Sequence, residues 1–164
     1  MAATNTLLAT TNSTHGITYG RGNSLGPYMI EQTIDFSNQN IDPNGSTIEC
    51  VDMPANSVCM FANIEVMTAL TSDQTDGTID LGISGGDEDS WVDGFDIDGA
   101  SAGTYATVLV GTNNPQMVDA AAPLKMTFAG TGGTISAGVL RVFAIVMPVG
   151  DLDKTDEASR DMLA

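Results

Sequence analysis

Apolar and polar side chains alternate along much of the chain between Tyr28 and Met147, and turn residues interrupt the alternation at short intervals. A two-residue period is that of a β-strand whose two faces meet different surroundings. The candidate strands are 28–35, 47–53, 57–67, 78–84, 91–96, 106–110, 124–129 and 138–147. Segments rich in Gly, Asn and Pro separate them, as the backbone angles of turns require.

Eight short strands at near-regular spacing predict an all-β protein, a two-sheet antiparallel β-sandwich. A jelly roll is the most natural arrangement of eight strands, and an immunoglobulin-like sandwich is the alternative. Thr, Ser, Asn and Gly dominate residues 1–27, and mixed charges mark the C-terminus. We therefore expect an extended N-terminal arm (1–27), a β-sandwich body (28–148) and a charged C-terminal tail (149–164).

Two candidate strands carry informative patterns. Alternation in 57–67 predicts one apolar face, with Asn63 and Glu65 on the opposite face. That apolar face comprises Val58, Met60, Ala62, Ile64 and Val66. The segment 138–147 is apolar on both faces, which predicts a central strand covered on both sides. Arg141 within it is either a rim residue that reaches water or the partner of an acid, and the rim is preferred.

Cys50 and Cys59 flank the turn at 54–56, so their pairing depends on the length of that turn. A two-residue turn would set them opposite each other and allow a cross-strand disulfide. A three-residue turn instead places the apolar residues of both strands on one face, and it points the two sulfurs to opposite sides. We prefer the second register, which predicts free thiols, in keeping with a reducing compartment.

The formal net charge is −16, from 21 acids against only five Lys and Arg residues. Nucleic-acid binding needs cations that displace condensed counterions, and an anionic membrane surface would repel this chain.

No apolar run approaches the roughly 18 residues of a membrane span. The N-terminus lacks the basic region of a secretory signal, so we expect synthesis in a cytoplasm. The acidity favours solubility.

Enzymatic patterns are weak. The sequence Gly-Ile-Ser-Gly-Gly at 82–86 matches the nucleophile elbow of hydrolases, with Ser84 as the nucleophile. The elbow needs a following helix and a later His, yet three acids follow and the only histidine, His15, lies upstream. A Gly-rich turn is the simpler interpretation. One His and two Cys on opposed faces do not make a zinc site.

The acidic stretch 86–99 is the most distinctive local feature. Its carboxylates could supply oxygen ligands to Ca²⁺, but the EF-hand template fails because Trp91 takes the fifth position. The alternative is a turn and a strand anchored by Trp91, Phe95 and Ile97, with a solvated acidic edge that discourages aggregation. We assign no catalytic, cofactor-binding or metal-binding residue.

Three segments together resemble the small virion proteins of tailed phages. They are TIECVDMPANSVCMFANIEVMTAL at 47–70, TIDLGISGGDEDSWVDGFDIDGA at 78–100 and GVLRVFAIVM at 138–147. The resemblance covers about 28–147 and is moderately specific. It departs from the pattern at Asn56, where Gly would be usual, and in the longer arm and the charged tail.

The resemblance implies a capsid decoration (cement) protein: a jelly-roll module on the exterior of an icosahedral phage head. Such a module would bind the major capsid protein, commonly as a homotrimer, and stabilise the shell without cofactor or catalysis. We expect it on the virion exterior, with assembly in the host cytoplasm. We expect the arm to contribute to attachment or to intersubunit exchange. A receptor- or glycan-binding fibre module and a hydrolase centred on Ser84 are the alternatives.

Overall fold

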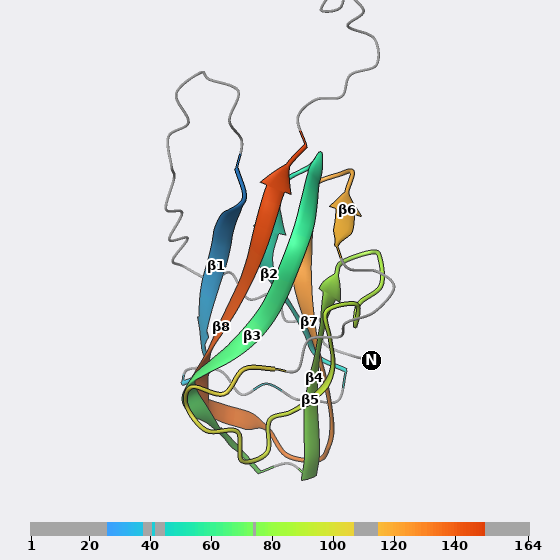
Figure 1. Cartoon of the computed structure of the whole chain (residues 1–164). Helices are drawn as coiled ribbons and strands as arrows, with labels where there is room; N and C mark the ends of the chain where they lie inside the picture. The colour runs from blue at the N-terminus through green and yellow to red at the C-terminus, as the bar shows by residue number, and fades with distance from the viewer. Residues whose placement is uncertain (1–25, 38–40, 42–44, 74, 107–114, 150–164) are drawn as a thin grey trace, which may run out of the picture.

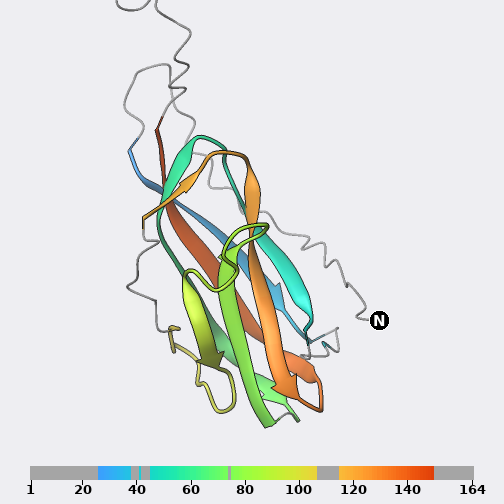
Figure 2. The same cartoon turned by 90° about the vertical axis from the view of Figure 1, so that its right-hand side faces the viewer.

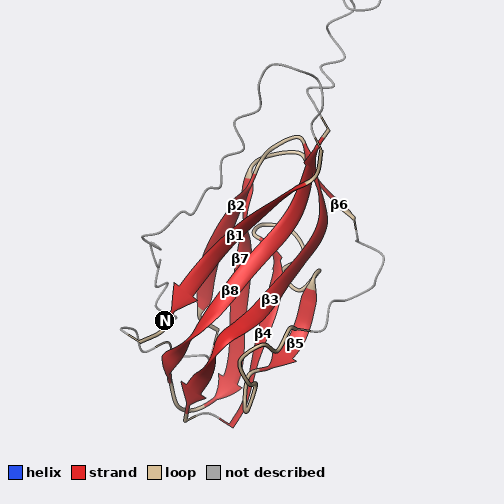
Figure 3. Ribbon diagram, turned by 60° about the vertical axis from the view of Figure 1, so that its left-hand side comes forward, coloured by secondary structure: helices blue, strands red, loops and turns tan. Residues whose placement is uncertain are grey.

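The computed structural model describes residues 26–37, 41, 45–73, 75–106 and 115–149, and within these it is built of strands and loops without a helix (Figure 3). The eight strands are β1 (Tyr28–Asp35), β2 (Thr47–Met53), β3 (Ser57–Ser72), β4 (Thr75–Ile83), β5 (Val92–Asp96), β6 (Gln116–Val118), β7 (Ala122–Thr131) and β8 (Ile135–Pro148). A search of this described part for a helix long and apolar enough to span a membrane finds none.

The strands form two four-stranded antiparallel sheets packed face to face. Sheet A has the order β1-β8-β3-β6, and sheet B has the order β2-β7-β4-β5. In Figure 1, β1, β8 and β3 form the front layer, with β2 and β7 behind. Strand β1 pairs with β8, β2 with β7, β3 with β6 and β4 with β5. This nested pairing is the topology of a jelly roll, so the predicted fold is confirmed and the immunoglobulin-like alternative is wrong.

Most predicted strands are present, and two have the predicted bounds, β1 and β2. The three-residue strand β6 was not predicted. The candidate strand 106–110 falls almost wholly outside the described residues. Its first residue, Ala106, donates a backbone hydrogen bond to Ile64 of β3 (2.9 Å), and the neighbouring Tyr105 forms a β-bridge with Glu65. Tyr105 and Ala106 therefore lie along β3 at Ile64 and Glu65. The arm (up to residue 25) and the tail (from 150) also lie outside the described residues.

The core lies between the sheets and takes its large side chains from both. The phenyl rings of Phe36 and Phe128 pack edge to face, with centroids 6.1 Å apart. Trp91 and Ile97 are almost fully buried, and Phe95 packs against the core, so the predicted anchors of the acidic segment are confirmed. Strand β5 is an edge strand of sheet B, and Asp93 and Asp96 on it are exposed, as the acidic-edge interpretation predicted.

Strand β3 departs from simple alternation near its start. Its register with β8 shifts between Cys59 and Phe61, which marks a β-bulge at Met60. The bulge reverses the faces on its N-terminal side: Cys59 is fully buried, whereas Met60 is exposed and Val58 half-buried. The predicted inward position is therefore wrong for Val58 and Met60, and it is confirmed for Ala62, Ile64 and Val66, which are fully buried.

The two cysteines are free, as predicted, although the register argument behind that prediction is wrong, and both are buried rather than on opposite faces. Strands β2 and β3 do not pair, because the turn at 54–56 carries the chain from sheet B to sheet A. Asn56 in this turn has a φ of 53°, a conformation that glycine and asparagine adopt more easily than other residues. Burial raises the pKa of both the Cys50 and the Cys59 thiol to about 12.

Candidate interaction surface

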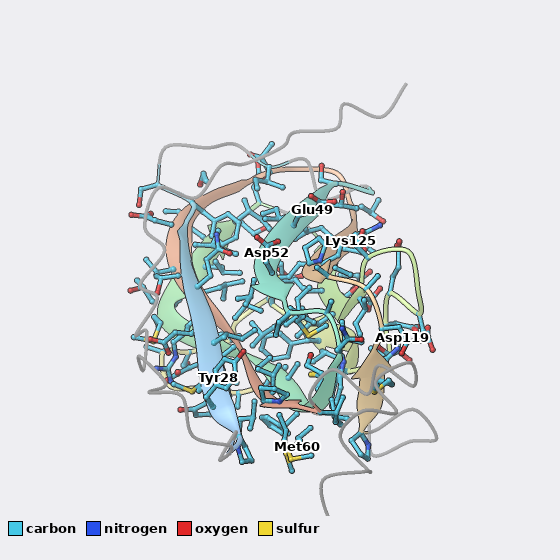
Figure 4. All side chains as sticks on the ribbon, turned by 90° about the horizontal axis from the view of Figure 1, so that it is seen from above. Tyr28, Glu49, Asp52, Met60, Asp119 and Lys125 are labelled. Carbon is cyan, nitrogen blue, oxygen red and sulfur yellow. The ribbon has the colours of Figure 1, made fainter. Side chains whose placement is uncertain are left out.

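The two outer faces of the sandwich differ in chemistry. Figure 2 shows the sheet B side, with β5, β4, β7 and β2 in front, and the outer face of this sheet is polar. Thr47, Thr127 and Asp80 stand side by side across β2, β7 and β4. On the next row Glu49 lies opposite Lys125, whose ammonium also forms an ion pair with Glu88. Figure 4, seen from above, places Glu49 and Lys125 on the opposite side of the body from Met60. A polar, charged face of this kind is suited to solvent.

The outer face of sheet A is largely apolar. Strand pairing sets Met29, Ile145 and Phe61 in one row across β1, β8 and β3. A second row, across β8, β3 and β6, contains Met147, Val58 and Met117. With the aromatic residues beside them these side chains form what we call the sheet A surface: Met29, Val58, Phe61, Tyr105, Met117, Phe143, Ile145 and Met147. Met29 and Tyr105 are each 51% exposed.

Aromatic rings form the centre of the sheet A surface. The ring centroids of Phe61 and Phe143 are 5.9 Å apart, and Tyr105 meets Phe143 edge to face at 6.4 Å. The guanidinium carbon of Arg141 lies 5.4 Å from the centroid of the Phe143 ring, within cation–π range. These contacts hold the rings in a fixed arrangement at the outside of the protein, so a partner would meet a pre-organised surface.

Arg141 lies beside this aromatic group rather than at a solvated rim. Its guanidinium pairs with Glu31 of β1 at 3.4 Å and with Glu65 of β3. The preferred interpretation from sequence, a rim residue, is therefore wrong, and the alternative, a partner of acids, is right. Because the neighbouring strands supply both carboxylates, the charge of Arg141 is neutralised within the sheet, next to the Phe143 ring.

Strand β8 is central in sheet A, as predicted, but only one of its faces is covered within the described part of the chain. Leu140, Val142, Ala144 and Val146 are fully buried against sheet B. The alternate side chains, from Val139 to Met147, point outward and are only half-buried. The apolar second face of β8 therefore belongs to the sheet A surface. Aromatic residues, Met and Arg are enriched in protein–protein interfaces; this surface carries aromatic residues and Met, and Arg141 lies beside it.

The Gly-rich sequence around Ser84 has a structural explanation. A Cβ atom on Gly82 would lie 2.1 Å from the carbonyl oxygen of Asp87, because the loop after β4 folds directly over this position. Gly85 has a φ of 79°, which a turn requires. The backbone N–H of Ser84 donates to the carbonyl of Pro123 (3.0 Å). His15, the only histidine, lies outside the described residues.

We expect Gly82→Ala to destabilise the fold and Ser84→Ala to leave it nearly unchanged. The added methyl group clashes with backbone that cannot yield cheaply, so it should lower the free energy of unfolding by about 3 kcal/mol. Loss of the Ser84 hydroxyl should change it by less than about 1 kcal/mol. Urea denaturation measures both variants, and a fluorophosphonate probe should label neither the native chain nor Ser84→Ala. Labelling that disappears in Ser84→Ala would establish the hydrolase alternative.

Carboxylates in the acidic segment and on the neighbouring strand β4 accept hydrogen bonds from nearby backbone. Asp80 accepts from the Gly94 N–H (2.6 Å), and Asp98 accepts from the Gly77 N–H (2.9 Å). A hydrogen bond and the like charge of Asp87 raise the pKa of the Asp89 carboxyl. Within the described ranges, no group of three or more His, Cys, Asp or Glu side chains is placed to hold a metal ion.

Comparison with known proteins supports the fold. No family model matches the chain, and no curated protein matches it in sequence. Among solved structures, a chain of the cyanophage Pam1 capsid asymmetric unit is similar to it, with a TM-score of 0.55 and 15% sequence identity. The match covers 85% of this chain and 99% of the phage chain. The two share a fold across nearly the whole of the phage chain.

Proposed function

We propose that this protein is a capsid decoration protein, a structural component of a phage virion. It binds the outer surface of an icosahedral capsid through its sheet A side, and it presents sheet B to the solvent. The observation that carries this proposal is the contrast between the two outer faces, one apolar and aromatic and the other polar and charged. A module that attaches by one side and remains soluble on the other requires such a contrast.

The structural comparison supports a virion role. The similar phage chain comes from a capsid asymmetric unit, and almost all of it is matched by this one jelly roll. The net charge of −16 also suits the capsid exterior, away from packaged DNA. We expect the protein to associate as a homotrimer, because repeated symmetric contacts gain affinity from multivalency rather than from one deep pocket.

Rebinding to stripped particles tests the proposal. Purified protein is mixed with capsids of its own phage from which it has been removed, and particles are sedimented to measure the bound protein. We expect saturation at a number of copies that matches the capsid symmetry. Failure to bind the capsids at any concentration would exclude a decoration role.

Matched variants identify the attachment side. Ile145→Glu places a charge on the sheet A surface, and Thr47→Glu places the same charge on sheet B; both positions are half-buried and lie on strands. We expect Ile145→Glu to weaken binding at least about tenfold, since a charge is costly to bury in an apolar contact. Thr47→Glu should bind like the native protein. The opposite ranking would mean that sheet B faces the capsid.

A further inference from the structure

The chain enters the body beside the sheet A surface. Gly26 and Pro27 lead directly into β1. Its second residue, Met29, pairs with Ile145, which is the central residue of the row Met29, Ile145 and Phe61 on the sheet A surface. Strand β1 is also an edge strand of sheet A (Figure 3), so the preceding residues approach the surface from its border. The N-terminal segment, residues 1–25, therefore joins the body next to an apolar face that the described residues leave uncovered.

The composition of the N-terminal segment differs from that of the remaining chain. All 21 acids lie at Glu31 or beyond, so the segment contains none, and it carries Arg21 and His15. Its apolar side chains include Leu7, Leu8 and Ile17. The sheet A surface is apolar around Arg141, Glu31 and Glu65, which together carry one excess negative charge. An acid-free segment with apolar side chains and a cation is complementary to that surface.

We propose that the N-terminal segment folds back over the sheet A surface of its own molecule. Twenty-five residues can extend to about 80 Å, whereas the eight residues of β1 span only about 27 Å, so the segment is long enough to reverse and cover the face. Its tether gives it an effective concentration of millimolar order at the surface. A second copy has no such tether, and it would bring a further charge of −16.

The C-terminal residues 150–164 are a poorer occupant, although they leave from the same end of the sheet. Val149 follows β8 at the end where Tyr28 pairs with Val146. However, residues 150–164 contain five acids against Lys154 and Arg160. Such a segment would place further negative charge beside Glu31 and Glu65, so the observations favour the N-terminal segment.

Disulfide trapping in the full chain tests this inference, which does not depend on capsid binding. Leu8→Cys is combined with Ile145→Cys on the sheet A surface, and in the matched control with Thr47→Cys on sheet B. Both target positions are within reach of the extended segment, so a difference in crosslinking reports where the segment lies. The native thiols of Cys50 and Cys59 should not interfere with the crosslinking, because both are buried.

Mild oxidation of dilute protein should give a crosslinked monomer for Leu8→Cys/Ile145→Cys several-fold faster than for the control. Trypsin cleaves after Arg21 and Arg141, so the expected disulfide joins peptides 1–21 and 142–154 and is identified by its mass. Equal rates for both pairs, or no crosslink, would overturn the proposal. A crosslinked dimer whose yield falls on dilution would also overturn it, because the occupant would then come from a second copy.

Discussion

Above about pH 9 the free energy of unfolding is expected to fall by about 1.4 kcal/mol per pH unit for each of the two buried thiols. The pKa of each is about 12 in the folded protein against an ordinary value of 9.0. Between these values the unfolded chain loses thiol protons that the folded chain keeps. The unfolded state is therefore stabilised relative to the folded state as pH rises above 9. Below pH 9 both thiols are protonated in both states, and the folded protein keeps its full stability.

Urea denaturation at pH 8, 9, 10 and 11 measures this effect, with the fluorescence of Trp91 as the probe because it is the only tryptophan and is buried. Two thiols together predict a slope of about 3 kcal/mol per pH unit, large against the 5–15 kcal/mol that stabilises a typical domain. The double variant Cys50→Ala/Cys59→Ala is the control. It should start from a lower stability and show a much shallower slope. An unchanged slope would mean that other groups cause the alkaline loss.

The sequence predicted the strands well because alternation is a local signal. The bounds of β1 and β2 follow from apolar side chains at every second position and from the turn residues beside them. The sequence also predicted free thiols, but through a wrong pairing. Whether the turn at 54–56 closes a hairpin or crosses between sheets depends on contacts with β7 and β8, far away in sequence. Local alternation carries no information on that choice.

The errors on β3 and β8 have the same physical origin. One inserted residue at Met60 reverses the faces on one side of the bulge, and nothing in the local sequence marks the insertion. Arg141 meets Glu31 and Glu65 only because β1 and β3 flank β8. The three-residue β6 is too short to show a period.

The sequence did contain a signal for the sheet A surface. Apolar residues on both faces of 138–147 predicted cover on both sides, and the structure shows that sheet B covers only one. The pattern therefore marked the apolar outer face of β8. It could not show that Met29, Phe61 and Met117 join the same face, since these come from strands brought together by long-range pairing.

Deletion of residues 1–25 is expected to abolish binding to capsids and to leave the body folded. Those residues contain none of the 21 acids of a chain whose net charge is −16. They also precede β1 at the border of the sheet A surface. Folded over the sheet A surface, the segment would form part of the side that meets the capsid, so its loss removes part of the attachment side. The sedimentation assay should then detect no bound protein, a loss of at least about 100-fold, equivalent to 2.7 kcal/mol or more.

Deletion of residues 150–164 is the matched control, because it shortens the chain at the same end of sheet A but removes five acids and two cations. This variant should bind at least as well as the full chain. Both truncated proteins should retain the fluorescence and the cooperative unfolding of the native body, since Trp91 and the core contacts of Phe36 and Phe128 lie within the described strands and loops. Full binding by the protein without residues 1–25 would show that the folded body alone provides attachment. Loss of binding together with loss of cooperative unfolding would instead assign the segment a role in folding.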